Sequence, residues 1–408
     1  MNKVDYLIIG GGIAGTTAAE EIRSKHQNGS IAIVTEESER LYSRVLLPHF
    51  LRNENSLESL FMRKPENYQQ KNIQLITSTK AIKIDTQNKI ASTSDKGEIG
   101  YEKLLIASGG KVNKIDVLGA DLPEVVYMRT LNDVRKIKEI ITGMDEAVVI
   151  GGGFIGADFA QIFVESNLKT SAIIRENSFW EDVVGENSGK LLSQILTRNG
   201  VNLVTEAQVA KFTGQEKLKS VQLTNGGEIK ADIAGVGIGV HLDTEYLKDS
   251  GLTIKQGVVT NEFLETSVPG VWAAGDIAEF YDPLFKRYHS LGNWANASSQ
   301  GRTTGINMAG GKVAFETASM YSINIFDSNF SFLGDPIVDE QTEVIERGGV
   351  EQGKLGRILL REDIITGASL INMPLERNAI TNLIKNRTKI PASKNKLSDT
   401  SFNLASIN

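Results

Sequence analysis

Residues 5–15 read DYLIIGGGIAG, and residues 148–163 read VVIGGGFIGADFAQIF. In both stretches a short apolar run leads directly into three glycines, and a segment of helical character follows. A continuous apolar run of this kind is typical of a parallel strand that is buried on both faces. Each stretch is therefore interpreted as a strand, a glycine-rich turn and the start of a helix.

The glycine spacing in both stretches fits a loop that binds the pyrophosphate of a dinucleotide. One glycine makes the tight turn, one lets the backbone approach the phosphates, and one lets the helix pack against the strand. The free N–H groups at the helix N-terminus attract phosphate. After the first loop comes a second apolar run, Ile31 to Val34, and then Glu36, where a ribose hydroxyl needs an acceptor. Glycine-rich turns that bind nothing are the alternative, but two loops in this context predict two dinucleotides.

Shorter apolar segments predict the remaining strands. They are residues 73–76, 81–84, 89–91, 104–110, 171–174, 201–204, 209–212, 220–223, 271–276, 357–361 and 364–371. Helices are predicted for residues 16–24, 157–166 and 374–385, and the polar residues 393–408 are expected to fray.

The composition restricts the chemistry. The 408 residues include no cysteine, which excludes a thiol nucleophile, a disulfide and a thiolate-bound cluster, so redox chemistry requires a bound cofactor. Four scattered histidines suggest no metal site, and a net charge of −6 argues against a nucleic-acid partner. No apolar run reaches the roughly 18 residues that span a bilayer. The expectation is a cytoplasmic protein.

Several motifs follow one another in a fixed order, and together they resemble a known family. They are the two loop stretches, LLIASGG at 104–110, GVGIGVHLDTEYLKDSGL at 235–252, VWAAGDIAEF at 271–280 and GNWANASSQGRTTGINMAGG at 292–311. The sequence resembles the FAD-dependent pyridine nucleotide oxidoreductases, close to the rubredoxin and ferredoxin reductases and the flavin module of NAD(P)H-nitrite reductases. The resemblance is strong over residues 3–310, weakens towards 390 and is absent beyond.

The resemblance implies an α/β fold with two Rossmann-like domains of the glutathione-reductase type and a small α+β C-terminal domain. The expected boundaries are 1–112 and 235–310 for the FAD domain, 113–234 for the NAD(P)H domain, 311–390 for a C-terminal interface domain and 391–408 for a polar tail. A homodimer is left open.

The resemblance also implies roles for individual residues. Gly10, Gly12 and Gly15 would face the flavin pyrophosphate, Glu36 the adenosine ribose, and Asp276 the ribityl chain, while Gly151, Gly153 and Gly156 would hold the nicotinamide dinucleotide. The further positions assigned to cofactor binding are Ile13, Ala14, Arg44, Ala81, Ala107, Ser108, Gly109, Phe154, Ile155, Arg175, Gly237, Gly275 and Trp294.

Three residues are assigned to the reaction centre by the same resemblance. The family's lysine–glutamate pair beside the flavin is replaced by His49 and Asp158, and these two are hypothesised to pair. The alternative is a surface histidine and an unrelated acid. Trp294 matches an aromatic that lies against the flavin ring, on a helix expected to begin near Ala297; a core aromatic is the alternative.

The choice between NADH and NADPH depends on the end of the strand after the second loop. Counted from Gly156, the position that is acidic in NADH enzymes is Ile174, and Arg175 and Glu176 follow. An arginine favours a 2′-phosphate and a glutamate repels it, so the sequence leaves the cofactor open, with a lean to NADH from the branch resembled.

The activity implied is hydride transfer from NAD(P)H to FAD and electron transfer to an external acceptor. The leading acceptor is a small carrier protein of the rubredoxin or ferredoxin type, or a partner redox subunit. An NAD(P)H oxidase using oxygen and a flavin-based NADH-sensing interaction protein are the alternatives. Basic residues near the C-terminus are candidates to dock an acidic carrier, or form a solvated helix end: Lys385, Arg387, Lys389, Lys394 and Lys396.

Overall fold

The computed structural model describes residues 3–390 and 394–407. The chain forms two compact units, each assembled from separate segments. The described residues of 1–45, 56–111 and 241–317 form the first unit, and those of 46–55, 112–240 and 318–408 form the second. The short strands β7 (Lys111–Val112) and β16 (Val240–His241) lie where the chain passes from one unit to the other.

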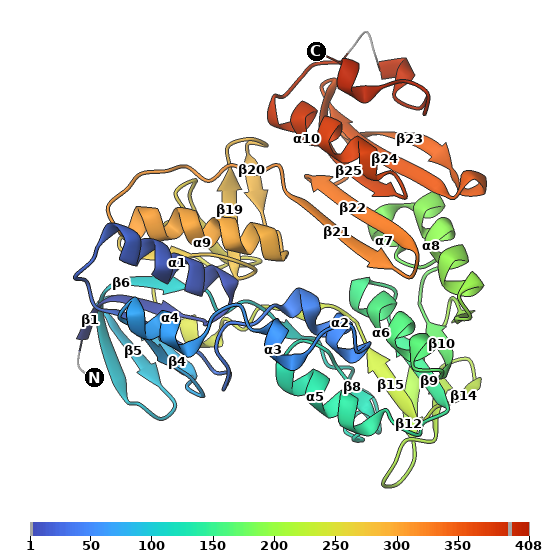
Figure 1. Cartoon of the computed structure of the whole chain (residues 1–408), viewed down its shortest axis with the longest axis horizontal. Helices are drawn as coiled ribbons and strands as arrows, with labels where there is room; N and C mark the ends of the chain where they lie inside the picture. Colours follow the sequence, from blue (N-terminus) through green and yellow to red (C-terminus); the bar gives the residue numbers. More distant parts are fainter. Residues whose placement is uncertain (1–2, 391–393, 408) are drawn as a thin grey trace. The chain divides into compact units, whose positions relative to one another are not determined.

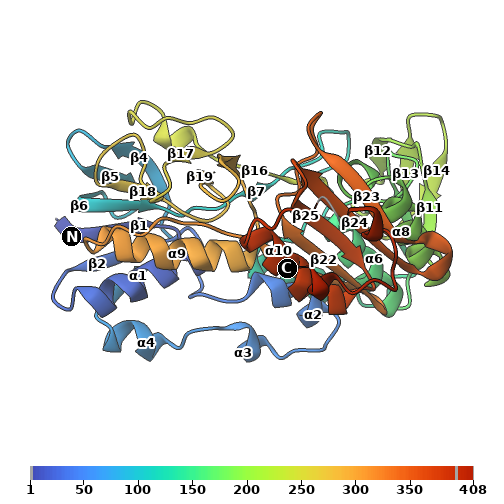
Figure 2. The same ribbon diagram turned by 90° about the horizontal axis from the view of Figure 1, so that it is seen from above.

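The first unit contains a seven-stranded sheet with the order β3-β2-β1-β6-β5-β4, and β18 also pairs with β6. Its strands are β1 (Lys3–Ile9), β2 (Ile31–Val34), β3 (Ile73–Ile76), β4 (Ala81–Asp85), β5 (Ile90–Thr93), β6 (Glu98–Ile106) and β18 (Val271–Ala273). β1 runs parallel to β2 and β6, as expected for a strand that feeds a glycine loop. Helices α1 (Ile13–Lys25) and α9 (Trp294–Met308) lie side by side on one face of this sheet (Figure 2).

Smaller elements complete the first unit. They are helices α3 (Leu57–Leu60) and α4 (Pro65–Gln70), the 3-10 turn η2 (Glu245–Leu247), and the three-stranded sheet β17 (Val258–Thr260), β19 (Ala278–Asp282) and β20 (Arg287–His289). The 3-10 turn η1 (Arg44–Leu46) spans the point where the chain passes into the second unit.

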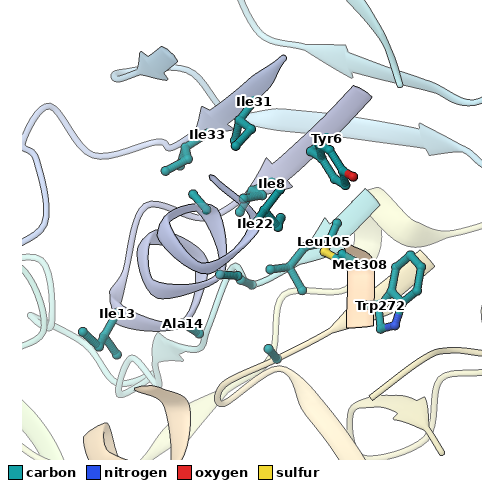
Figure 3. Packing of buried hydrophobic residues seen from close by; sticks show 14 of the residues in the cluster. Tyr6, Ile8, Ile13, Ala14, Ile22, Ile31, Ile33, Leu105, Trp272 and Met308 are labelled. Carbon is teal, nitrogen blue, oxygen red and sulfur yellow. The ribbon is translucent and has the colours of Figure 1, made fainter. Parts of the chain in front are cut away.

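The core of the first unit follows from the alternation along β1. Tyr6 and Ile8 point towards α1, where Ile22 meets them, and Met308 of α9 closes the same apolar cluster (Figure 3). Leu7 lies in a second cluster on the opposite face. Burying each such aliphatic side chain contributes about 1.5–3 kcal/mol, so both faces of the strand stabilise the fold.

The second unit contains a five-stranded parallel sheet with the order β11-β10-β9-β15-β8. Its strands are β8 (Val125–Val126), β9 (Glu146–Ile150), β10 (Lys169–Ile173), β11 (Asn202–Val204) and β15 (Ile233–Val236). The predicted boundary between residues 234 and 235 divides β15, which belongs wholly to this sheet. The other predicted domain boundaries stay predictions.

Five helices and a small antiparallel sheet accompany the parallel sheet. They are α2 (Leu47–Leu51), α5 (Leu131–Ile140), α6 (Phe154–Glu165), α7 (Glu181–Val184), α8 (Glu186–Arg198), and the strands β12 (Val209–Thr213), β13 (Ser220–Leu223) and β14 (Glu228–Lys230). The apolar cluster between the two sheets includes Val148, Ala234, Phe212 and Val221.

The end of the chain adds a five-stranded antiparallel sheet with the order β21-β22-β25-β24-β23. Its strands are β21 (Met320–Ile325), β22 (Ser328–Gly334), β23 (Glu343–Gly349), β24 (Lys354–Arg361) and β25 (Ile364–Ile371), with helix α10 (Arg377–Lys385) against β22 and β25 (Figure 1). The 3-10 turns η3 (Val350–Gln352), η4 (Pro374–Glu376), η5 (Lys394–Lys396) and η6 (Leu404–Ser406) complete this region.

The expectation that residues 393–408 fray is wrong for the described residues 394–407. The buried guanidinium of Arg347 donates to the backbone carbonyls of Leu397, Asp399, Thr400 and Phe402. Its Nε donates to the Glu376 carboxylate at 2.8 Å. Composition concealed this because the tail is fixed through its backbone carbonyls and through only a few separate buried side chains, Leu397 and Leu404 among them. Residue 393 lies outside the described residues.

Candidate functional site

The first glycine loop (residues 10–15) has the geometry of a phosphate cradle. Gly10 has φ +119°, and a Cβ there would lie 2.1 Å from the carbonyl oxygen of Ala107. A Cβ on Gly15 would lie 2.0 Å from the carbonyl oxygen of Gly10. At Gly12, the N-cap of α1, a Cβ would meet nothing within 4 Å, and no side chain caps the helix. The N-terminal N–H groups of α1 therefore face open space, as a bound pyrophosphate requires.

The second glycine loop (residues 151–156) repeats this geometry. Gly151 has φ +106°, and a Cβ there would lie 2.4 Å from the carbonyl oxygen of Gly237. A Cβ on Gly156 would lie 2.1 Å from the carbonyl oxygen of Gly151. Gly153, the N-cap of α6, again faces open space and lacks a side-chain cap. Both loops fit a dinucleotide. Ala107 and Gly237 contribute through their backbone carbonyls, which lie so close to Gly10 and Gly151 that no side chain fits there.

Charged residues surround the end of β2 in the first unit. Lys111 Nζ lies 3.6 Å from Glu36 and 2.8 Å from Asp243. The guanidinium of Arg44 pairs with Glu37 and lies 3.1 Å from the Tyr42 hydroxyl. Glu36 is thus placed beside the first loop with a lysine partner that the sequence did not indicate.

The electrostatics of Arg44 favour its charged form. Burial lowers the pKa of the guanidinium, but the neighbouring Tyr42 and Glu37 outweigh that effect and raise it, with a smaller contribution from Asp276. Arg44 therefore stays cationic among Glu37, Tyr42 and Asp276, and a guanidinium held in this form could compensate the charge of a phosphate or a flavin.

Gly275, just after β18, packs closely against both α1 and α9. Gly275, with φ +80°, donates its N–H to Gln300 Oε1 at 2.7 Å, and a Cβ on Gly275 would lie 3.2 Å from the Cβ of Ala14. Helix α9 begins at Trp294 rather than near Ala297, because Asn293 caps it by accepting from the backbone of Asn296 at 2.9 Å.

Other predicted flavin-site residues lie around this region. Trp294 is partly buried against the main apolar cluster, and Asp276 lies beside Gly292. The Ser108 hydroxyl accepts from the Tyr246 hydroxyl at 2.9 Å, and Gly109 has φ +68°. The remaining three, Ile13, Ala14 and Ala81, are buried.

At the end of β10 the side chain of Ile174 is in the core. It is 1% exposed, and its Cγ2 lies 3.2 Å from a Cβ built on Gly152. The matching contact in the first loop is between Gly11 and Thr35. The residue that corresponds to Glu36 is therefore Arg175, not Ile174, and the Arg175 side chain is 73% exposed. Counting residues from Gly156 missed this because the two helix–strand connections differ in length.

The hypothesised His49–Asp158 pair is wrong. His49 Nδ1 is paired with Glu54, whose carboxylate also accepts from Arg52 Nε at 2.8 Å. The Arg52 bond, together with His49, lowers the pKa of Glu54 to about 2 against the opposing effect of burial. Glu54 lies five residues after His49, so a local carboxylate competes successfully for the imidazole.

Asp158 has a different charged neighbour. Burial raises the pKa of its carboxyl to about 7, and Arg52 is the charge that opposes this shift. The Arg52 side chain is 5% exposed and also lies 3.4 Å from Glu165. Asp158 is thus a partly exposed acid with a raised pKa, four residues after Phe154 on α6, and groups of this kind are candidates for a functional site.

Sequence reasoning missed an aromatic cluster at the second loop. Its members are Phe154, Trp180, Tyr321 and Phe332, with ring centroids 3.8 Å apart for Phe154–Trp180 and 5.3 Å for Trp180–Phe332. Only Phe154 could be identified from the sequence, because it lies next to the glycine motif. The other three residues come from separate strands and turns.

The basic residues near the C-terminus do not act as one group. Lys394 forms ion pairs with Glu343 and Asp363, and Lys396 lies over the Phe402 ring. Lys385, Arg387 and Lys389 are exposed at the end of α10.

Across residues 3–390 and 394–407, no helix has the length and apolarity to cross a membrane, and no three His or acidic side chains gather to hold a metal.

Comparison with known proteins gives a consistent result. The family model described as pyridine nucleotide-disulphide oxidoreductase matches residues 4–301. Putidaredoxin reductase of Pseudomonas putida is 27% identical over 100% of this chain and 97% of its own length. NADH-rubredoxin oxidoreductase of Clostridium acetobutylicum is 30% identical over 76% of each chain. The solved covalent putidaredoxin reductase–putidaredoxin complex contains a chain that aligns with a TM-score of 0.92 at 27% identity, covering 99% of this chain and 98% of that one.

Proposed function

Because the chain belongs to the pyridine nucleotide-disulphide oxidoreductase family, we propose that it passes electrons from NAD(P)H to a small one-electron carrier protein. It is an NAD(P)H-dependent flavoprotein oxidoreductase that uses FAD. A cytoplasmic location belongs to this proposal, because NAD(P)H is available there.

The single observation that carries the proposal is the combination of two cradles with no cysteine. Family members that reduce disulfides pass electrons through a cysteine pair, and this chain has none. When bound, FAD supplies the chemistry that links a two-electron hydride donor to one-electron acceptors. Electrons must therefore leave for an acceptor outside this chain, and the relatives named for putidaredoxin and rubredoxin support a carrier protein.

The residues of the chain supply orientation and charge. Gly12 and the N-terminus of α1 are proposed to hold the FAD pyrophosphate, and Gly153 and the N-terminus of α6 that of NAD(P)H. Arg44 holds a positive charge beside the first cradle, and the N-terminus of α9 adds a partial positive charge next to Asp276. Holding two reactants in a fixed geometry lowers the barrier by several kcal/mol.

The proposal is tested by following the absorbance of the FAD-loaded protein in a rapid-mixing experiment. After anaerobic reduction by NAD(P)H, the protein is mixed with purified rubredoxin, with a [2Fe–2S] ferredoxin, or with air-saturated buffer. We expect one carrier to reoxidise it at least about tenfold faster than air does. Faster reoxidation by air than by every carrier would contradict the proposal and favour an oxidase, and slow reoxidation by all of them would favour an NADH-sensing protein.

A further inference from the structure

Trp180 has a backbone conformation that its side chain does not favour. Its φ is +63° and its ψ is +21°, in the left-handed region. A bulky side chain is a clear outlier in this region, and the conformation costs about 1–3 kcal/mol of folding free energy. Such a residue persists where the surroundings fix it, and outliers of this kind gather at functional sites.

The backbone of Trp180 is placed against the second glycine loop. Its amide nitrogen lies 3.3 Å from a Cβ built on Gly152, so the turn after β10 folds directly over the loop. The preceding residue, Phe179, is fully buried, and its N–H donates to Ser193 Oγ at 2.8 Å. The turn is therefore held by the glycine loop at Trp180 and by α8 at Phe179, which limits its freedom to relax.

The side chain of Trp180 meets Phe154, the first residue of α6. The ring centroids are 3.8 Å apart with an interplanar angle of 72°. Phe154 follows Gly153, the position where a Cβ would enter open space. The Phe154–Trp180 pair thus lies one residue from the proposed pyrophosphate seat, and both rings are only partly buried. Partly exposed aromatic faces suit the planar rings of a dinucleotide.

Two aromatic residues of the antiparallel C-terminal sheet pack against the Phe154–Trp180 pair. Tyr321 of β21 and Phe332 of β22 stack with centroids 5.0 Å apart, and Phe332 lies 5.2 Å from Phe154. The same sheet also holds the turn: Arg357 donates to the carbonyl of Val183 at 3.3 Å, and Glu346 accepts from Asn187 at 2.7 Å. The C-terminal strands therefore contribute directly to the surroundings of the second loop.

We propose that Trp180 is a positioning residue for the nicotinamide dinucleotide, and that β21 and β22 belong to the cofactor-binding structure through Tyr321 and Phe332. Trp180 fixes the ring of Phe154 at the mouth of the second loop, so the dinucleotide meets an ordered aromatic wall. This role rests on the proposed function, since it requires NAD(P)H to bind at the second loop. It assigns to the C-terminal sheet a part in the affinity for the electron donor.

The test measures the Kd of NADH and NADPH for the FAD-loaded protein by titration calorimetry, with the melting temperature of each variant. Trp180→Gly accepts the left-handed backbone, so we expect an unchanged or raised melting temperature and a Kd about tenfold higher. Trp180→Phe keeps an aromatic ring and is expected to bind within about twofold of wild type. Phe332→Leu is expected to raise the Kd about threefold to tenfold.

The matched control is Leu333→Val, which shortens a buried side chain on the opposite face of β22. It is expected to lower the melting temperature and leave the Kd unchanged. Wild-type affinity in Trp180→Gly, or an equal change of Kd in Phe332→Leu and Leu333→Val, would overturn the inference alone. Failure of wild type to bind either nicotinamide dinucleotide would overturn the proposed function as well.

Discussion

The first and second glycine loops share a backbone but not their surroundings. Each has a first glycine with a positive φ, a last glycine packed against the carbonyl of the first, and an N-cap glycine that faces open space. The first lies near polar and charged side chains, including Gln300, which accepts from Gly275, and Glu36, which pairs with Lys111. The second lies beside partly exposed aromatic rings and the exposed Arg175. If the first loop holds FAD and the second NAD(P)H, as proposed, the difference between the two ligands must come from the surrounding side chains, because the cradles themselves are alike.

The largest expected effects come from filling the open position in each loop. Gly12→Ala should fold and lose FAD, whereas Gly153→Ala should keep FAD and bind NAD(P)H at least about 100-fold more weakly, equivalent to about 2.7 kcal/mol. The physical reason is that a Cβ at either position meets no protein atom within 4 Å and enters only the open space that the proposal assigns to phosphate. The measurements are the visible absorbance of the purified variants and the Kd for NAD(P)H. A colourless Gly153→Ala protein would show that the loops do not bind independently.

The next largest expected effect is a pH dependence of stability that arises from Asp158 on α6 and has no counterpart on α1. Because the pKa of Asp158 is raised to about 7, the folded protein binds this proton more tightly than the unfolded chain does. The stabilisation is present at low pH and is lost as pH rises through about 7, by at most about 4 kcal/mol. Asp158→Asn should therefore become progressively more stable relative to wild type between about pH 4 and pH 7, with a constant difference at higher pH.

The control for this pH dependence is Thr17→Val, at the matching position of α1, whose stability difference from wild type should not change with pH. Denaturant unfolding across the pH range gives both curves. A pH-independent difference for Asp158→Asn would mean that the carboxyl is already ionised in the folded protein.

A smaller effect is expected from two matched glutamines. Gln300 Oε1 accepts from the Gly275 N–H at 2.7 Å, and Gln161 Oε1 of α6 accepts from the Phe326 N–H at 3.0 Å. Replacing Gln300 by leucine leaves a buried donor unpaired and should cost about 1–3 kcal/mol, and replacing Gln161 leaves a partly buried donor and should cost less. Only Gln300→Leu should also speed the release of FAD during dialysis, because only Gln300 supports the first site. Equal FAD loss from both variants would contradict the difference drawn between the two loops.

The smallest expected effect is on the choice of nicotinamide cofactor. Arg175 occupies the place that Glu36 holds in the first loop. Arg175→Glu should change the ratio of kcat/KM for NADH to that for NADPH by about tenfold towards NADH, about 1.4 kcal/mol. Arg175→Lys should keep a ratio close to that of wild type. An unchanged ratio in Arg175→Glu would mean that the ribose is recognised elsewhere.

The parts of the fold set by neighbouring residues were predictable. Strands such as β2, β3 and β25 have the predicted bounds, because their apolar runs end at turn residues. The two cradles were predictable because each depends on the sterics of about six consecutive residues. The family resemblance then supplied FAD, NAD(P)H and the kind of reaction, which the family match confirms.

Contacts between distant segments were not predictable in this way. The charge that opposes the raised pKa of Asp158 comes from Arg52, more than 100 positions away in the chain. The docking of residues 394–407 on Arg347 likewise uses backbone carbonyls that composition does not reveal.

The sequence by itself determined the two phosphate cradles and the absence of a thiol relay, since both depend on which residue types are present and how closely they are spaced. Only the tertiary structure decided which charge acts on Asp158, which residue is the counterpart of Glu36, and that Trp180, Tyr321 and Phe332 form an aromatic wall. These depend on how separate strands and turns are brought together in three dimensions, where burial and distance, rather than local steric rules, determine which side chains interact.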